Sequence, residues 1–402
     1  MIRYFSFKNF KSYRSETIFD FKAAAIPEFE ESLLKSPKMA GDILPVSVLY
    51  GPNGGGKTNL LQALSCLISM VVKPVVELEK NRESIVLQYY VPCQPYLLDD
   101  LSKDEPTEFQ IYFRIKSNEY RYYISVFKGE IVSESLYWKA LGGHRTGTVF
   151  EREKSDISLG NSINKISVNR QINPKMSYLS FLAINYDIPM VAEVVTWFER
   201  CIIQSYAVPE VDRKIYVADD SDLKKKIIRA LNDLDIDIVD YRYDPAENEL
   251  YTKRSLDGKA YELPFASESD GTKKLLAALP IMLIALRDGR LVVIDELDAK
   301  LHPKLLRYMI RLFKNPEINT HGAQLLFTSH DLTTMRNTVF RRDEIWFSAL
   351  EKNHESRIYS LYDIRDEHDR HVNSTSAYDK QYMEGRYGAD PYLQNLLGEE
   401  WS

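Results

Sequence analysis

The sequence has few cysteines and no apolar run long enough to cross a membrane. Its 402 residues include three cysteines, Cys66, Cys93 and Cys201, at spacings that match no metal site. An odd number of widely separated cysteines argues against a disulfide framework and favours a reducing compartment. The longest apolar stretch, Leu275–Leu286, contains Pro280 and is about half as long as a membrane span. We therefore expect a cytoplasmic protein without a transmembrane segment.

We also expect no secretory signal and no coiled-coil arm, and the chain has no excess of basic charge. Charged residues at Arg3, Lys8 and Lys11 interrupt the start of the chain. No Cys-x-x-Cys pair and no long heptad array is present. With 52 basic and 58 acidic residues the formal charge is −6, which gives no general attraction to nucleic acid. Local basic runs at 224–226 and 341–342 are typical of solvated surface, so DNA or RNA stays an open partner.

A glycine-rich loop is the most informative motif that is present. The run Gly51-Pro52-Asn53-Gly54-Gly55-Gly56-Lys57-Thr58 follows apolar residues 46–50 and precedes a helical pattern at 59–70. Glycines let backbone N–H groups turn toward phosphate oxygens, and the helix N-terminus favours an anion. Lys57 supplies a cation to the outer phosphates, and the Thr58 hydroxyl can hold Mg²⁺. The order of strand, loop and helix therefore predicts a nucleotide-binding phosphate loop.

Two carboxylates end a second apolar run. Residues 291–294, Leu-Val-Val-Ile, are typical of a strand that is buried on both faces of a parallel sheet. Asp295 at its carboxyl end can accept from the water shell of a metal, and Glu296 can orient or deprotonate an attacking water. The alternative is a core strand capped by two solvated acids. Together with a phosphate loop, the functional interpretation is favoured.

A histidine and a helix start complete the pattern. Residues 323–329 predict another buried strand, and His330 at its end can donate a hydrogen bond to a γ-phosphate, although a lone histidine is more often structural. Ser269, Asp270 and Gly271 precede the apolar helix pattern at 275–286. These are ordinary capping residues. The same exposed N–H groups can hold a phosphate.

The order of these four motifs resembles the ATPase heads of the ABC superfamily, in the branch of SMC, RecF and OLD-like proteins. Residues 2–13 look like the first strand of that branch, with Lys11 and Ser12 in a turn near the phosphates. Residues 295–303 resemble its acidic strand and the following D-loop, which holds Asp298. Residues 268–274, 301–303, 342–347 and 382–388 are most similar to bacterial AAA-family ATPases of abortive-infection and RloA-like defence systems.

The resemblance implies a fold, a cofactor and a dimer. The implied fold class is α/β: an ABC-type P-loop ATPase head with a mixed or parallel central sheet, an antiparallel β layer, and a helical lobe inserted between the phosphate loop and the signature. The implied cofactors are ATP and Mg²⁺. The resemblance makes Lys57, Glu296 and His330 catalytic and places Thr58 and Asp295 on the metal. It assigns nucleotide contacts to Lys11, Ser12, Asn53, Gly54, Gly55, Gly56, Lys57, Thr58 and Asn59, and, across a subunit seam, to Ser269, Gly271 and Asp298.

Two positions depart from the family pattern. The signature reads Ser-Asp-Gly-Thr, and a carboxylate at Asp270 is unfavourable near a triphosphate unless it points away or caps the helix. The glutamine of the Q-loop is either Gln88 or Gln94.

Three stretches organise the chain. We expect an N-terminal ATPase lobe at 1–145 that holds the phosphate loop and antiparallel strands at 108–115, 120–127 and 131–140. A mainly helical inserted lobe follows at 146–250, with helices at 188–205 and 221–234. The C-terminal ATPase lobe at 251–402 holds the signature, the acidic strand and His330, and Pro303 starts a helix there. The run 366–371 has the ligand types of a metal site but not its spacing, and is expected to be a loop.

Three functions stay open at this point. The first is a nucleotide-dependent dimerising switch, or sensor, that controls a separately encoded effector in bacterial anti-phage defence. Nothing in the chain resembles a nuclease, protease or acyl-transfer centre, so the effector chemistry would lie in that partner. The alternatives are a DNA-maintenance ATPase of the RecF or SMC type and a non-hydrolysing scaffold that uses ATP for assembly. The expected partners are a second copy of the chain, in a dimer or a larger assembly, and the effector.

Overall fold

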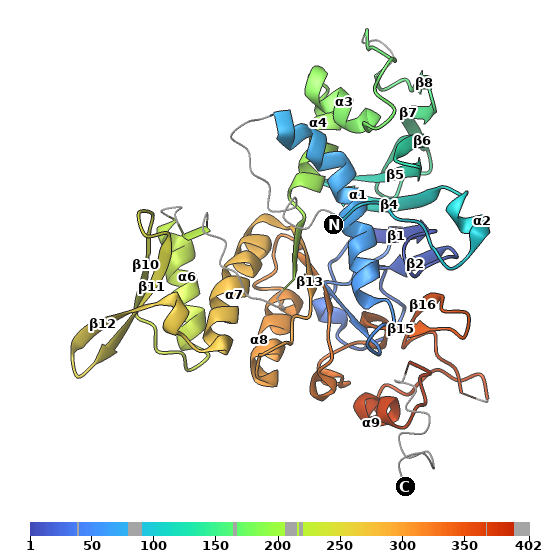
Figure 1. The fold of residues 1–402 in the computed structure, drawn as a ribbon. Helices are drawn as coiled ribbons and strands as arrows, with labels where there is room; N and C mark the ends of the chain where they lie inside the picture. The colour runs from blue at the N-terminus through green and yellow to red at the C-terminus, as the bar shows by residue number, and fades with distance from the viewer. Residues whose placement is uncertain are drawn as a thin grey trace.

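Three β-sheets and the helices between them make up the fold (Figure 1). The computed structural model describes residues 1–37, 40–78, 91–163, 167–205, 215–216, 220–366 and 368–389. The fold class is α/β, as the sequence predicts.

A six-stranded sheet carries the phosphate loop at its edge. The strand order is β16-β15-β3-β14-β13-β9, and every pairing is parallel except that of β16 with β15. Parallel strands end at the same edge of a sheet, so the carboxyl ends of β3, β14 and β13 lie next to one another. The strands are β3 (Val46–Tyr50), β9 (Ile202–Ser205), β13 (Leu291–Asp295), β14 (Gln324–Thr328), β15 (Ile345–Leu350) and β16 (Ser356–Ser360).

Helices cover both faces of this sheet. Leu49 and Val293 belong to the same core as α1 (Lys57–Leu78). Val48 and Ile294, one residue away on the same strands, belong to a second core that contains residues of α7 (Asp270–Asp288) and α8 (Pro303–Lys314). Successive residues of a strand point to opposite faces. The consecutive apolar residues of β3 and β13 are therefore required on both sides.

A seven-stranded antiparallel sheet packs on the core of α1 and confirms the predicted antiparallel layer. Its order is β2-β1-β4-β5-β6-β7-β8. The turn at residues 116–117 joins β4 to β5, and the strand predicted at 131–140 is β6. The strands are β1 (Ile2–Lys8), β2 (Thr17–Asp20), β4 (Thr107–Ile115), β5 (Asn118–Phe127), β6 (Glu130–Ala140), β7 (Gly147–Glu153) and β8 (Asp156–Leu159). Helices α3 (Tyr178–Asn185) and α4 (Pro189–Glu199) share the same core.

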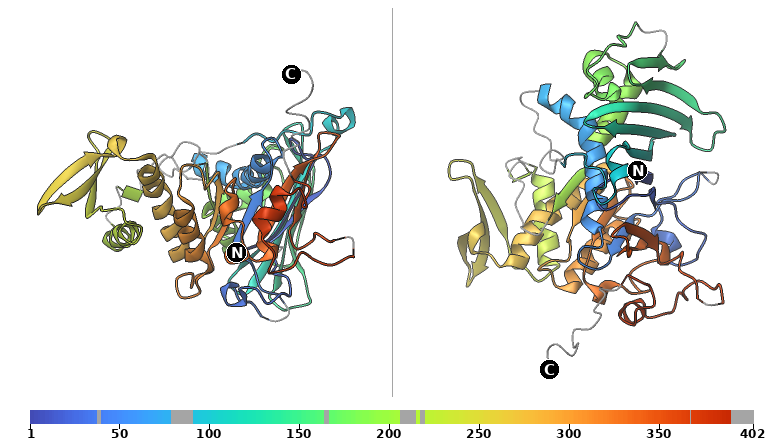
Figure 2. Two further views of the ribbon diagram at one scale, coloured as in Figure 1. Left: turned by 90° about the horizontal axis from the view of Figure 1, so that it is seen from below. Right: turned by 45° about the vertical axis from the view of Figure 1, so that its right-hand side comes forward.

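A three-stranded antiparallel sheet projects from the head beside α6 (Ser221–Asn232), as both views of Figure 2 show. Its strands are β10 (Asp240–Asp244), β11 (Glu249–Leu256) and β12 (Lys259–Pro264). The buried Glu268 carboxylate accepts from Thr252 Oγ1 and, at 2.7 Å, from Arg254 Nη2. The sheet is thereby joined to the start of α7. The remaining short elements are η1 (Glu30–Ser32), α2 (Asp100–Lys103), η3 (Phe265–Ser267), η4 (Leu332–Thr334), η5 (Arg342–Glu344) and α9 (Tyr378–Met383).

The range 146–250, which we expected to be mainly helical, contains strands as well as helices. The predicted helix at 188–205 is α4, and it ends at Glu199. Residues 202–205 form β9, which pairs parallel with β13. A short apolar run does not distinguish a helix from a strand by periodicity, and the neighbouring strand decides its state. The expected division of the chain at residues 145 and 250 stays a prediction.

One helix within the described residues, α1, is long and apolar enough to cross a membrane by length and composition. However, 72% of its apolar window is buried inside the fold, as expected of a core helix. A second apolar segment, α3 with α4, is bent by 116°. All three cysteines are free thiols, in agreement with the expectation that no disulfide framework is present.

Candidate active site

The phosphate loop connects β3 to α1 in the predicted order of strand, loop and helix. A Cβ atom at Gly51 would lie 2.1 Å from the Ser348 carbonyl oxygen, and one at Gly56 would lie 2.4 Å from Ser356 Oγ. Both glycines also have positive φ, 146° and 105°, which other residues rarely adopt. Only glycine fits at these two positions.

Two side chains support the loop from below. The Tyr13 hydroxyl donates to the Gly56 carbonyl at 3.1 Å, and Ser348 Oγ donates to the Gly55 carbonyl at 2.6 Å. Because Tyr13 and Ser348 hold the carbonyls of Gly56 and Gly55, these carbonyl oxygens would not face a phosphate in the loop. Burial raises the pKa of Tyr13 above its usual range, so this hydroxyl remains a donor.

Lys57 folds back onto the loop. Its ammonium group donates to the carbonyls of Gly51 at 2.8 Å and Pro52 at 3.0 Å. Burial lowers the pKa of Lys57, while the nearby carboxylates of Asp295 and Glu296 oppose that shift. A bound phosphate would offer the Lys57 ammonium group a charged acceptor in place of these two neutral carbonyls.

The two residues that the sequence predicts to hold the metal lie in direct contact. Thr58 Oγ1 donates to Asp295 Oδ2 at 2.9 Å, and Thr328 Oγ1 donates to the other carboxylate oxygen at 2.6 Å. The backbone N–H of Glu296 in turn donates to Thr328 Oγ1 at 2.8 Å. Mg²⁺ is usually held by one or two protein oxygens together with phosphates and water. One hydroxyl and one carboxylate at the end of a phosphate loop fit that requirement.

The catalytic candidates Glu296 and His330 face the same cavity, which has a volume of about 260 Å³. Glu296 has φ 54°, an uncommon value for a residue with a side chain. Lys274 Nζ donates to the Glu296 carbonyl at 2.7 Å and holds this conformation. Lys274 is fully buried, and burial lowers its pKa to about 8.

The structure brings most of the predicted site residues to that cavity. Its lining consists of Pro52, Asn53, Gly54, Gly56, Lys57, Thr58, Asn59, Asp295, Glu296 and His330. Gly55 lies in the same loop but contacts Ser348. Asp298 does not line the cavity; its Oδ2 accepts from the His330 backbone N–H at 2.9 Å. The roles of all these residues in binding a nucleotide stay predictions.

Lys11 and Ser12 contact α1 and do not line the cavity. Asn59 Nδ2 donates to Ser12 Oγ at 2.8 Å, and Lys11 Nζ donates to Gln62 on α1. The backbone N–H of Lys11 also donates to the Gln94 carbonyl at 2.9 Å. Of the two glutamines considered for the Q-loop, Gln94 is therefore near this turn, and Gln88 lies outside the described residues.

The signature residues lie at the start of α7 and do not line the cavity of their own chain. Ser269 caps the helix by accepting from the Thr272 N–H at 3.2 Å. The Asp270 carboxylate pairs with Lys300 Nζ at 3.0 Å. Ser269 is exposed and Gly271 is half-buried.

Sequence reasoning missed Thr328 and Lys274. A threonine that ends a buried strand beside an acidic strand is the only signal for Thr328. Lys274 has a stronger signal, because it lies next to the apolar run of α7 and a buried lysine is uncommon.

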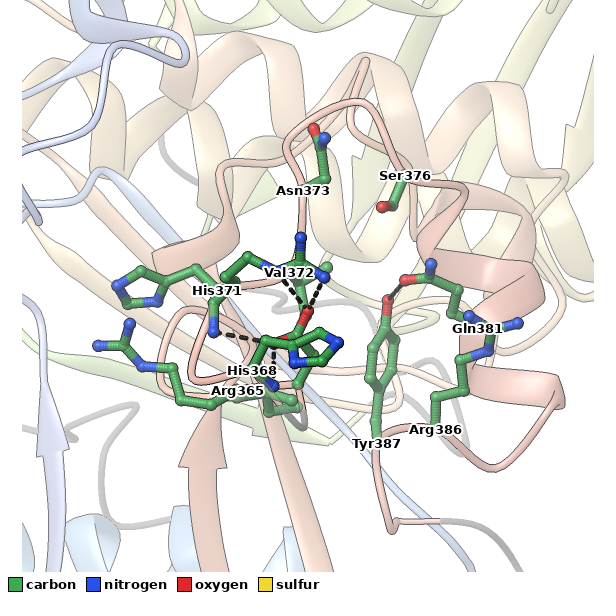
Figure 3. Close-up of a pocket in the computed structure, with 12 residues that line it drawn as sticks. Arg365, His368, His371, Val372, Asn373, Ser376, Gln381, Arg386 and Tyr387 are labelled. Carbon is green, nitrogen blue, oxygen red and sulfur yellow. Dashed lines mark hydrogen bonds and ion pairs between the residues drawn. The ribbon is translucent and has the colours of Figure 1, made fainter.

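The run 366–371 is a loop beside a cavity, shown in Figure 3. No group of three or more His, Cys, Asp or Glu side chains within the described ranges is arranged to hold a metal ion.

A family model described as "AAA domain, putative AbiEii toxin, Type IV TA system" matches residues 46–336. The chain therefore belongs to this AAA domain family of P-loop ATPases. None of the curated proteins matches the chain by sequence.

Three solved structures are similar over most of their length. The SMC head domain from Thermotoga maritima has 12% identity and a TM-score of 0.44, covering 90% of this chain and 98% of that one. An SMC head bound to the C-terminal winged-helix domain of ScpA has 13% identity and a TM-score of 0.41, with 90% and 97% coverage. The ATP-binding cassette MJ0796, in a dimer with ADP and phosphate, has 11% identity and a TM-score of 0.31, with 90% and 100% coverage. Because all three scores are below 0.5, the assignment rests on the family model and on the site geometry.

Proposed function

We propose that this chain binds ATP with Mg²⁺ and hydrolyses it to ADP and phosphate. The observation that carries the proposal is the contact of Thr58 with Asp295, beside Lys57, Glu296 and His330 around one cavity. Mg²⁺, held by Thr58 and Asp295, would neutralise charge on the phosphates. Glu296 would take the proton of the attacking water while the bond from the γ-phosphorus to the ADP oxygen breaks. His330 and Lys57 would donate to the γ-phosphate oxygens.

The site would be completed by a second copy of the chain. The N-terminus of α7 is exposed at Ser269 and lies outside the cavity of its own subunit. Helix N-termini of this kind bind anions through free N–H groups. A γ-phosphate held by two subunits makes dimer closure depend on ATP, and hydrolysis would weaken the contact.

We place this switch in bacterial anti-phage defence, in the cytoplasm, where it would control a separately encoded effector. The family description names a type IV toxin–antitoxin system, which supports a defence setting.

The proposal is tested with Glu296→Gln, which keeps the shape of the side chain and removes the base. We expect this variant to bind ATP, to turn over at least about a hundredfold more slowly, and to accumulate as a dimer in light scattering. Glu130→Gln at an exposed strand start is the matched control. Wild-type turnover in Glu296→Gln would remove Glu296 from the catalytic residues.

A pull-down with the neighbouring gene products, with and without a non-hydrolysable ATP analogue, tests the effector. Stimulation of turnover by DNA would favour the DNA-maintenance ATPase instead. Tight ATP binding without turnover in the wild-type protein would favour the assembly scaffold.

A further inference from the structure

A second cavity lies in the C-terminal part of the chain, away from the phosphate loop. It has a volume of about 750 Å³ and is bordered by residues 364–366 and 368–376 on one side and by α9 with the turn after it on the other (Figure 3). Small-molecule sites have volumes of about 300–1,000 Å³. None of its lining residues lines the nucleotide cavity.

The charged side chains that line this cavity are mainly cationic. The cations are Arg365, Arg370 and Arg386, and Asp366 is the single acid among the described lining residues. The imidazoles of His368 and His371 also line the cavity. Arg365 has no ion pair within the described part of the chain. Arg386 pairs with Glu384 at 2.7 Å, but both side chains are more than half exposed, and such pairs are weak.

The Asp366 carboxylate already accepts hydrogen bonds from its own loop. Asp366 Oδ1 accepts from the backbone N–H groups of His368 and Arg370, both at 2.9 Å, and Oδ2 accepts from Arg370 Nε at 2.9 Å. These bonds, first that from the Arg370 N–H, lower the pKa of Asp366 to about 2. The carboxylate is therefore used to hold the loop and offers little to a ligand.

Two amides present their donor ends. Asn373 Oδ1 accepts from Thr375 N and from Thr375 Oγ1, both at 2.9 Å. Gln381 Oε1 accepts from the Tyr387 hydroxyl at 2.7 Å. Both oxygens are thus occupied, and the NH₂ groups of Asn373 and Gln381 are the ends that are left for a ligand.

We propose that this cavity binds a phosphate group, carried by a nucleotide or by a nucleic acid strand. The Arg365 guanidinium and the amide N–H donors of Asn373 and Gln381 match an oxyanion, and arginine binds phosphate in a bidentate manner. The volume accommodates a nucleoside phosphate rather than a bare ion. The site is independent of ATP hydrolysis, since it shares no residue with the nucleotide cavity.

The test measures fluorescence anisotropy of a short 5′-phosphorylated oligothymidylate, labelled at its 3′ end, with the full chain carrying Lys57→Ala. That substitution removes the phosphate-loop contribution. We expect binding that weakens as salt is raised. AMP and inorganic phosphate are added as competitors, and a 5′-hydroxyl oligothymidylate is compared. AMP binding to the same protein is also measured directly by calorimetry. AMP binding without strand binding assigns the site to free nucleotides, and strand binding that AMP does not displace assigns it to the nucleic acid backbone.

Three variants connect the binding to this cavity. Asn373→Asp and Gln381→Glu keep the hydrogen bonds made by the amide oxygens and replace the NH₂ donors by a charged acceptor. Arg365→Glu reverses the charge of the arginine that makes no ion pair with the described residues. Each variant should weaken binding of whichever probe binds the Lys57→Ala protein, AMP or an oligothymidylate, at least about tenfold. Asn173→Asp is the matched control, since Asn173 Oδ1 accepts from the Lys175 N–H at 2.9 Å in the same geometry in a distant loop.

The proposal is overturned if neither AMP nor either oligothymidylate binds the Lys57→Ala protein. It is equally overturned if Asn373→Asp, Gln381→Glu and Arg365→Glu weaken binding no more than Asn173→Asp does. Loss of ATP turnover in other variants has no bearing on either outcome.

Discussion

The Thr58 hydroxyl donates a 2.9 Å hydrogen bond to the Asp295 carboxylate, and the two residues are 237 positions apart in the chain. Thr58 lies in the first turn of α1, and Asp295 ends β13. They meet because β14 lies between β3 and β13 in a parallel sheet, so both strand ends face the same edge. This contact brings the two halves of the predicted site together.

Lys57→Ala should abolish ATP binding at the phosphate loop. Its ammonium group donates to two carbonyls of the phosphate loop. Without it, the phosphates of a bound nucleotide would lack this counter-charge. We expect the affinity for a fluorescent ATP analogue to fall at least about a hundredfold, while the melting temperature changes little. Lys128→Ala, at an exposed turn of the antiparallel sheet, is the control and should bind as the wild type does. Near-normal affinity in Lys57→Ala would refute the role of the loop.

Thr328→Val should raise the Mg²⁺ concentration needed for half-maximal turnover. The hydroxyl both holds Asp295 and accepts from the Glu296 N–H. Valine has the same shape, so the change removes two hydrogen bonds and leaves one buried N–H without a partner, at a cost of about 1–3 kcal/mol. Turnover should fall about tenfold or more at limiting Mg²⁺. The measurement is a Mg²⁺ titration of the ATPase rate.

Thr375→Val supplies the comparison for that experiment, because this threonine also donates to a side chain but lies outside the site. An unchanged Mg²⁺ dependence in Thr328→Val would show that Asp295 is positioned without the hydroxyl.

Mixing two inactive variants should restore turnover if the site is shared. Lys57→Ala removes one phosphate loop, and Ser269→Arg blocks one signature. In a heterodimer of the two, one site keeps an intact loop from one subunit and an intact signature from the other. An equal mixture is expected to recover about a quarter of wild-type activity, since half of the dimers are mixed and each has one working site.

Each variant alone serves as the control and should remain inactive. No recovery on mixing, or full wild-type activity at a dilution at which only single subunits remain, would contradict the shared site.

Glu119→Gln should destabilise the fold and reduce its sensitivity to acid. The buried Glu119 carboxylate lies 3.1 Å from Arg114 Nε, 3.0 Å from Lys139 Nζ and 3.3 Å from Arg3 Nη1. Burial alone would raise its pKa, but these cations outweigh that effect and lower it. A carboxyl with a lowered folded pKa stabilises the protein above its unfolded pKa and loses that contribution as pH falls through the folded pKa. The loss at neutral pH should be about 3 kcal/mol.

Urea unfolding at neutral pH and again below the unfolded pKa of a glutamate, about 4.3, measures this difference, which should shrink in acid. Glu351→Gln removes an exposed pair with Arg357 and should cost less than about 1 kcal/mol. An equal loss in both variants, or a gap that stays constant with pH, would show that Glu119 is not held ionised by its neighbours.

Several elements could be predicted from the sequence because their signals are local. Glycine spacing defines the phosphate loop, branched apolar runs define β3, β13 and β14, and proline at Pro303 marks the start of α8. The antiparallel hairpin of β4 and β5 shows alternation and a turn. Other elements carry no such signal. The short β9 is a strand only because β13 offers it a partner, and it was expected to be part of a helix.

The amino-acid sequence by itself determined which residue types would meet a triphosphate, since Lys57, Thr58, Asp295, Glu296 and His330 each follow a recognisable local pattern. The tertiary structure alone decided how they are held. Thr328 and Lys274 act through contacts with Asp295 and Glu296 that depend on strand order and helix packing, and no local pattern encodes them. The cavity around Asn373 and Gln381 arises in the same way, because its donors are defined by which oxygens the folded chain has already used.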